Sequence, residues 1–219
     1  MNSIVSLSGG MDSGTALAWA KEHSMDVLAI GFIYGSKHNP YEQECAEQLA
    51  EHFQIEFMRV NLTDIFFNLK SNLLLSGGEI PEGHYESDSM KQTVVPGRNI
   101  IFASILVGIA ESRGFDTVVL GIHAGDHVIY PDCRPEFFNA MNCAVRHGTN
   151  EKVNLKAPFL YGDKSTILKY GYKREFPYHL TRTCYKDQEL ACGKCGACTE
   201  RLEAFRSIGE EDPIEYEDE

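Results

Sequence analysis

A short apolar strand that runs directly into a glycine pair constrains this chain more than any other feature. Ile4 and Val5 form a β-branched run typical of a buried strand, and Ser8-Gly9-Gly10 follows almost at once. Residues 15–21 have the composition and spacing of a helix. Two glycines leave backbone N–H groups open to an anion, and a helix N-terminus adds positive potential there. The sequence therefore predicts a phosphate-binding turn between the first strand and the first helix.

Asp12 is an unexpected residue for an anion site. A carboxylate repels phosphate unless a divalent cation lies between them, which points to Mg²⁺. The turn lacks the lysine of a Walker loop and the third glycine of a dinucleotide fingerprint. Ser-Gly-Gly-x-Asp-Ser after an N-terminal strand instead resembles the PP-loop of the ATP pyrophosphatases, although Gly14 stands where that loop commonly continues with Ser or Thr. This resemblance implies that ATP is bound by Leu7, Ser8, Gly9, Gly10, Met11, Asp12, Ser13, Gly14, Thr15, Ala16 and Leu17.

Composition limits the classes of protein to consider. A chain of 219 residues that is 43% hydrophobic can bury one substantial core. We find no secretory signal and no apolar run near the ~20 residues that span a bilayer, so we expect a soluble, cytoplasmic protein without a membrane partner. The net charge is −12, which argues against a broad nucleic-acid surface. Seven acidic residues among the last ten predict a disordered tail over 209–219.

Apolar strands and amphipathic helices alternate along the chain. This order predicts an α/β fold with a doubly wound, mostly parallel sheet and ligands at the carboxyl ends of its strands. We expect residues 1–176 to form the ATP-binding domain. The polar segment 77–93 has no clear period, and a loop of this length indicates a functional element such as an active-site lid. Further strands are predicted at 27–34, 55–60 and 117–122, and helices at 41–53, 62–75, 96–113, 136–146 and 163–176.

Four of the seven cysteines lie close together near the C-terminus. Cys192, Cys195 and Cys198 form two consecutive C-x-x-C steps separated by small residues, and Cys184 precedes them. Four thiolates suit tetrahedral Zn²⁺, and clustered cysteines in a cytosolic protein indicate a metal before a disulfide. An iron–sulfur cluster is the main alternative. We expect residues 177–208 to form a small structural zinc-binding region packed on the main domain.

Charged residues also gather where the strands are expected to end. Arg98 opens the long apolar helix, where it can bind a phosphate or carboxylate. Asp126 and Asp132 follow the fourth strand. Together with Arg134 of the same loop, they are candidates to coordinate Mg²⁺ and to bind an anionic substrate. Lys164 lies at a helix start, which the helix dipole disfavours unless the lysine faces an anion such as ATP.

These motifs occur in the order seen in the QueC family of 7-cyano-7-deazaguanine synthases, and the resemblance runs from residue 3 to about 206. It rests on the PP-loop, Val-Pro-Gly-Arg-Asn at 95–99, Tyr-Pro-Asp-Cys-Arg at 130–134 and the four cysteines. Val128 and Ile129 depart from the Ser-Gly of many relatives. We assign catalysis to Asp12, Ser13, Arg98 and Lys164. We assign substrate binding to Arg98, Asn99, Asp126, Tyr130, Asp132 and Arg134.

The resemblance implies ATP-dependent conversion of 7-carboxy-7-deazaguanine and ammonia to the nitrile preQ0, through an adenylated acid and an adenylated amide. It also implies a homodimer with ATP, Mg²⁺ and Zn²⁺ as cofactors. An enzyme that stops at 7-amido-7-deazaguanine, and release of ADP in place of AMP, stay open. A PP-loop tRNA-modifying enzyme would need a basic RNA-binding surface, which this chain lacks. A non-catalytic nucleotide-binding or zinc-binding module is the remaining alternative.

Overall fold

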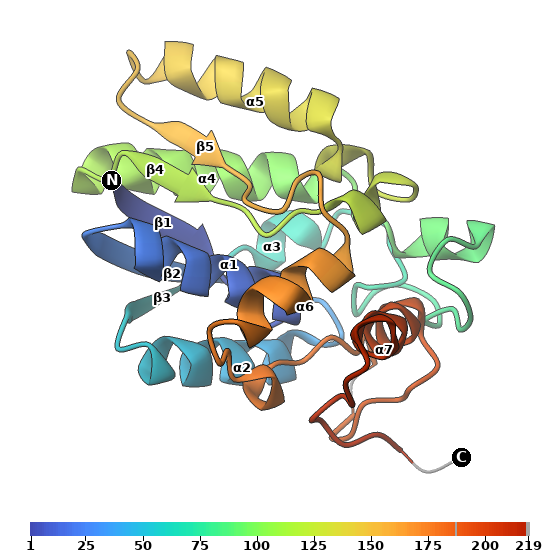
Figure 1. The fold of residues 1–219 in the computed structure, drawn as a ribbon. Coiled ribbons are helices and arrows are strands. Elements are labelled where there is room, and N and C mark those ends of the chain that lie inside the picture. Colours follow the sequence, from blue (N-terminus) through green and yellow to red (C-terminus); the bar gives the residue numbers. More distant parts are fainter. Residues whose placement is uncertain (187, 218–219) are drawn as a thin grey trace.

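The strand that precedes the glycine pair lies at the centre of a five-stranded parallel sheet (Figure 1). The computed structural model describes residues 1–186 and 188–217. The strands lie in the order β3-β2-β1-β4-β5, and every neighbouring pair is parallel. This topology confirms the predicted α/β class. The strands are β1 (Asn2–Ser6), β2 (Asp26–Ile33), β3 (Glu56–Asn61), β4 (Thr117–Val119) and β5 (Asn154–Lys156).

Helices cover both faces of the sheet (Figure 1). One face carries α1 (Met11–His23), α2 (Asn39–His52) and α6 (Lys164–Tyr172), and the other carries α4 (Arg98–Arg113) and α5 (Pro135–Gly148). Side chains alternate along a strand, so Ile4 packs in the cluster beneath α4 while Val5 packs in the cluster beneath α1. Within the described residues no helix combines the length and apolarity that a membrane crossing needs.

Two predictions of local structure differ from the observed elements. The helix predicted over 62–75 is wrong beyond its first turn, because α3 spans only Thr63–Phe66. The chain then turns back, and Leu74 bridges to Ser36 in the loop after β2, which places Leu73 and Leu74 in the core. The strand β5 was not predicted, because its three residues bury only Leu155 fully.

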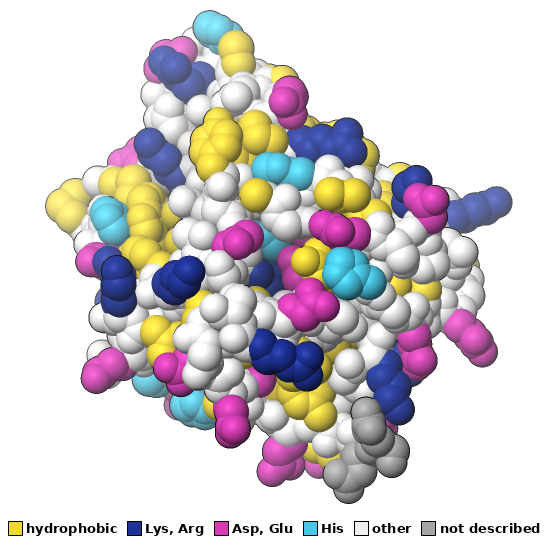
Figure 2. All heavy atoms as spheres, turned by 45° about the vertical axis from the view of Figure 1, so that its right-hand side comes forward, with side chains coloured by type: hydrophobic (Ala, Val, Ile, Leu, Met, Phe, Trp, Pro, Cys, Tyr) yellow, Lys and Arg dark blue, Asp and Glu magenta, His cyan; other side chains and the backbone are white. Residues whose placement is uncertain are grey.

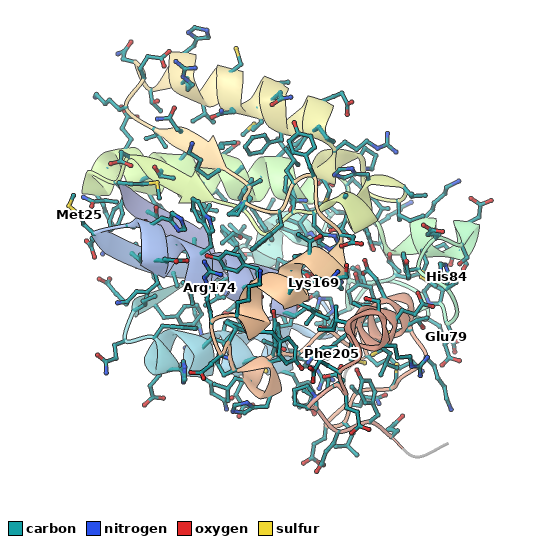
Figure 3. The ribbon with its side chains drawn as sticks, viewed as in Figure 1. Met25, Glu79, His84, Lys169, Arg174 and Phe205 are labelled. Carbon is teal, nitrogen blue, oxygen red and sulfur yellow. The ribbon has the colours of Figure 1, made fainter. Side chains whose placement is uncertain are left out.

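The C-terminal residues pack more tightly than the predicted disordered tail. Helix α7 (Gly196–Ile208) contributes Phe205, labelled in Figure 3, which contacts Tyr172 and Tyr178 with ring centroids 6.3 and 5.7 Å apart. Arg201 is fully buried and binds Asp212 through two hydrogen bonds of 2.6 and 2.8 Å. The tail expectation therefore does not hold for residues 210–217, because one of its acids neutralises a buried arginine.

Replacing Asp212 with Asn should destabilise the protein. The substitution leaves the buried Arg201 guanidinium without a counter-charge, which costs about 3–5 kcal/mol. Chemical denaturation measures the free energy of unfolding. Glu211→Gln removes an exposed charge from the neighbouring position and should change the stability by less than about 0.5 kcal/mol. Equal effects of the two substitutions would show that the tail does not stabilise the fold.

Candidate functional site

The loop between β1 and α1 has the shape of an anion site. Gly9 adopts a φ of +88°, and a Cβ atom there would lie 2.2 Å from the carbonyl oxygen of Glu42, so only glycine fits. Gly10 precedes α1 in an extended conformation. The hydroxyl groups of Ser8 and Ser13 lie 3.0 Å apart across the loop. The N–H groups of the first turn of α1 have no partner within the helix and remain available to an anion.

Gly14 faces the core and takes no part in this loop. A Cβ atom at Gly14 would lie 2.8 Å from the ring of Phe176 and 3.1 Å from Leu49. Its N–H donates to the carbonyl of Gly10 at 2.9 Å, which closes the first helical turn. The departure from Ser or Thr at this position is therefore explained by packing, and the Gly14 amide is not available to a ligand.

The loop opens into a cavity at the carboxyl edge of the sheet. Figure 2 views this edge and shows acidic and histidine side chains around a central hollow, with a basic side chain at its floor. The walls come from β1, β2, the start of α2, the start of α4, the loop after β4, and α7. Of the predicted residues, the cavity is lined by Leu7, Ser8, Gly10, Asp12, Ser13, Arg98, Asn99, Asp126, Tyr130 and Lys164.

Lys164 joins three elements at one end of this cavity. Its ammonium lies 3.3 Å from Asp12 in α1 and 2.6 Å from Glu200 in α7. Burial alone would raise the pKa of Asp12, but the interactions with Lys164 and His123 together outweigh it and hold the pKa below its usual value. The carboxylates of Asp12, Glu200 and Asp126 together outweigh the burial of Lys164 and raise its pKa. A lysine at a helix start is thus held charged by nearby acids, and one of them belongs to the phosphate loop.

His123 lies beside this group and is fully buried. Its Nδ1 accepts the N–H of Gly125 at 3.1 Å, so the hydrogen of the neutral ring lies on Nε2, and a charged ring carries one there too. Nε2 lies 3.5 Å from the carboxylates of both Asp12 and Asp126. Although His123, Asp126 and Glu200 lie close enough to hold a metal ion, the N–H of His123 faces the acids instead. Nε2 is buried without a hydrogen-bond partner among the described residues, so the ring faces the two acids at ion-pair distance only.

The remaining predicted site residues do not line the cavity. Met11, Thr15, Ala16 and Leu17 are buried in the core, on the inner side of α1. Their side chains consequently position the loop. Gly9 gives the loop its turn through its positive φ.

Asp132 and Arg134 support the neighbouring loops. The Asp132 carboxylate accepts the backbone N–H of Asn99 at 2.9 Å, which fixes the first turn of α4 and with it Arg98. Arg134 donates to the carbonyl of His127 at 2.7 Å and so braces the turn after β4. Arg98 points into the cavity, where its Nη1 donates to the hydroxyl of Tyr34 at 3.4 Å.

Several cavity residues escaped sequence reasoning. Glu200 lies two residues after the last clustered cysteine, so we interpreted its surroundings only as part of the cysteine motif. The other missed residues lie in helices and turns without a recognisable pattern. Tyr34 and His123 each lie at or just after the end of a predicted strand, and this position in the sequence could have identified them as candidates. The residues that were missed are Tyr34, His38, Glu42, Gln43, His123, Arg182, Tyr185 and Glu200.

The four clustered cysteines form a compact, buried group. The sulfur atoms of Cys184, Cys192, Cys195 and Cys198 all lie within 4.8 Å of one another. Backbone N–H groups point at two of these sulfurs, as at Cys192, which accepts the N–H of Cys195 at 3.3 Å. Such donors stabilise thiolates, and Gly193, with a φ of +66°, allows the chain to turn between the cysteines. The group is therefore built to hold one metal ion.

The segment 77–93 packs against this cysteine group. Gly83 donates its N–H to the carbonyl of Lys194, and Glu82 bridges to Cys195. Tyr85 and Met90 line a smaller cavity that shares Asp126, Tyr130 and Glu200 with the main one. The segment thus forms one wall of the smaller cavity, beside the cysteine group.

Removing the donor between the two acids should destabilise the site. His123→Leu removes the ring whose Nε2 lies 3.5 Å from the carboxylates of Asp12 and Asp126, and should lower the free energy of unfolding by about 1–3 kcal/mol. His123→Gln keeps a side-chain N–H and should lose less. His147→Leu, at a position 78% exposed, is the control and should stay within about 0.5 kcal/mol. If Leu and Gln at 123 cost the same in chemical denaturation, His123 only fills space.

Comparison with known proteins gives consistent matches over the whole chain. Residues 2–209 match the family described as "Queuosine biosynthesis protein QueC". The 7-cyano-7-deazaguanine synthase of Marinomonas sp. (strain MWYL1) is 46% identical over 98% of this chain and 97% of its own length. The enzyme of the same name from Caldicellulosiruptor saccharolyticus is 45% identical over 99% of this chain and 96% of its own length.

Solved structures share the fold at much lower identity. NMN synthetase from Francisella tularensis superposes with a TM-score of 0.52 at 14% identity, over 96% of this chain and 78% of that one. The U34-tRNA thiolase NcsA of Methanococcus maripaludis, solved with its [4Fe-4S] cluster, gives 0.51 at 17% identity, over 93% of this chain and 64% of that one. These likenesses show the fold alone, whereas the sequence matches show that the chain belongs to the QueC family.

Proposed function

We propose that this chain is an ATP-dependent carbon–nitrogen ligase that makes 7-cyano-7-deazaguanine from 7-carboxy-7-deazaguanine and ammonia. The observation that carries the proposal is the pairing of two subsites in one cavity. Asp12, Lys164 and the phosphate loop lie at one end, and Arg98 lies among aromatic side chains at the other. The names of the relatives that are 43–46% identical over nearly their full length support the same activity.

The first half of the proposed reaction activates the acid. A carboxylate oxygen of the substrate attacks the α-phosphorus of ATP, the bond to the β-phosphate breaks, and pyrophosphate leaves. The first-turn N–H groups of α1 and the Lys164 ammonium stabilise the charge that develops on the pyrophosphate. Arg98 holds the substrate carboxylate. Ammonia then attacks the acyl carbon, AMP leaves and a proton is lost, which gives the amide.

The second half repeats the activation on the amide. Its oxygen attacks the α-phosphorus of a second ATP, and pyrophosphate leaves again. Loss of the two N–H protons and departure of AMP with the oxygen leave the carbon–nitrogen triple bond. Because both steps place an oxygen at the same α-phosphorus, one set of residues serves both. The wall formed by residues 77–93 would exclude water, which otherwise hydrolyses the activated acid.

Mg²⁺ fits the phosphate end of this cavity. Among the described residues the Oδ1 atom of Asp12 is buried and has no hydrogen-bond partner. Three acids, Asp12, Asp126 and Glu200, surround a site that must accept the polyphosphate of ATP. Asp12 would hold the cation, which when bound would neutralise phosphate charge.

Zn²⁺ fits the cysteine group. Four sulfurs on one tetrahedral ion at about 2.3 Å lie close together, as observed here. An iron–sulfur cubane binds each cysteine through a separate iron and needs a wider arrangement. All four positions are cysteine, so the ion has no open coordination site. Its part in the proposed function is structural, holding the start of α7.

Assembly and location are part of the same proposal. The side chains of Ile65, Phe67 and Leu75 are 53%, 74% and 68% exposed, and a homodimer would cover such apolar surface. Free ammonia serves as the nitrogen donor, since the motifs of this chain include no glutaminase site. A cytoplasmic location suits reduced cysteines and the supply of ATP.

Asp12→Asn should abolish most turnover while leaving the fold intact. Loss of the metal-binding carboxylate should lower kcat by roughly a hundredfold or more. Mass spectrometry of products from 7-carboxy-7-deazaguanine, ATP and ammonium measures nitrile, amide and AMP together. Asp26→Asn, an exposed acid at the start of β2, is the control and should keep full activity. Accumulation of amide without nitrile in the unaltered protein would contradict the proposed product.

The purified protein should contain one Zn²⁺ per chain and be colourless. Cys195→Ser removes one ligand of a site whose metal contributes roughly 10 kcal/mol, and should sharply lower the melting temperature and the zinc content. Cys143→Ser, at an exposed cysteine outside the group, should change neither. Elemental analysis provides the measurement. Iron together with visible absorbance would overturn the zinc assignment.

A further inference from the structure

We propose that Glu42 determines base specificity by accepting the paired N–H donors of the deazaguanine ring. This inference rests on the proposed function, because it names the residue that recognises the proposed substrate. Glu42 lies in the first turn of α2, directly after β2, and its side chain lines the same cavity as Asp12 and Lys164. The side chain is only 14% exposed.

Glu42 lacks the counter-charge that a buried carboxylate normally has. Its nearest ion-pair partner is Nε2 of His38, at 3.3 Å. Burial and the nearby Arg98 charge lower the pKa of His38 to about 3, so this ring is neutral. Burial also raises the pKa of Glu42 to about 8. Glu42 is therefore largely protonated in the empty cavity, and N–H donors that enter the cavity would favour its ionised form.

The charges of the two arginines in the cavity only partly offset the effect of burial on the pKa of Glu42, and both guanidinium groups hydrogen-bond to other groups. Arg182 donates to the backbone carbonyls of Lys186, Gln188 and Glu189. Arg98 donates to the hydroxyl of Tyr34. Within residues 1–186 and 188–217, neither guanidinium lies within ion-pair distance of Glu42. The ion-pair contact that Glu42 does make, with Nε2 of His38, uses only its Oε2 atom.

The chemistry of the cavity restricts what this acid can face. Both proposed substrates are anions, so a carboxylate here repels them unless it meets N–H donors. A guanine-like ring carries N1–H and the 2-amino group side by side, and the two oxygens of one carboxylate can accept both. Adenine presents its amino group beside a ring acceptor and lacks this pair. The carboxylate therefore fits the deazaguanine better than it fits ATP.

The neighbouring side chains suit a flat ring. Aromatic side chains line the same cavity as Glu42 and Arg98, and two of them, Phe32 and Phe102, stack on each other with centroids 4.0 Å apart. A ring bound there would place its donor edge at Glu42 and its carboxylate at Arg98. The N–H groups of the ring would then donate to Glu42, and the substrate carboxylate would accept from Arg98. The aromatic lining consists of Phe32, Tyr34, Phe102, Tyr130 and Tyr185.

The test compares the substrate with an analogue that lacks the 2-amino group. Glu42→Gln keeps the size of the side chain but replaces one acceptor with a donor. It should raise the Kd for 7-carboxy-7-deazaguanine roughly tenfold to a hundredfold in titration calorimetry, with little change in the KM for ATP. The unaltered protein should bind the analogue more weakly than the substrate, and Glu42→Gln should lose most of this discrimination. Glu44→Gln, an exposed acid on the same helix, is the matched control.

Each outcome separates the two proposals. A variant that still discriminates fully between substrate and analogue overturns the role of Glu42 while the proposed function stands. An effect confined to the KM for ATP also overturns it, since Glu42 would then face adenine. If the unaltered protein neither binds nor converts the deazaguanine, the proposed function itself fails. Unchanged melting temperatures establish that the variants are folded.

Discussion

The ion pair of Lys164 with Asp12 and Glu200 is the contact on which the rest of the site depends. It joins the phosphate loop, the start of α6 and the second turn of α7, which come from the beginning, the later part and the end of the chain. Lys164 alone would be poorly placed at a helix N-terminus, and two buried acids alone would repel each other. Together they form a charged group that is stable in a buried position.

The same group links the metal region to the cavity. Cys195 and Cys198 lie at the start of α7, and Glu200 follows within the same helix. A metal ion that fixes the cysteines would consequently fix Glu200 and, through it, Lys164. The middle of α7 is held by the buried pair of Arg201 and Asp212. The helix is thus anchored both at its start and near its middle, on either side of the residue that reaches the cavity.

Local patterns were sufficient to predict most of the fold. The β-branched runs, the glycine pair and the apolar helices predicted the α/β class, and the helix expected from residue 163 begins there because Asp163 accepts the N–H of Thr166. Predictions failed where distant contacts decide the structure. Residues 67–75 have helical composition, but hydrogen bonds between Leu73 and Lys37 and between Leu75 and Gly35 fold them against the loop after β2.

The candidate site was predictable only where a residue belonged to a recognisable motif. Asp12, Arg98 and Lys164 follow strands or open helices and were found for that reason. His123 and Glu42 are ordinary helix or loop residues in the sequence, and their burial beside charged groups depends on how α2 and the loop after β4 pack. Asp132 belongs to a recognisable motif, but its carboxylate accepts the backbone N–H of Asn99 and so supports the backbone there.

The position of Lys164 and Glu200 in the chain has a consequence for biosynthesis. A ribosome releases β1, α1 and β2 long before the residues that neutralise Asp12 exist, and Arg201 has no counter-charge until Asp212, eleven residues later, has been made. The sheet can therefore begin to form during translation, but the charged centre closes only after α7 has emerged. The phosphate loop would then reach its final charge balance after the sheet that positions it has formed.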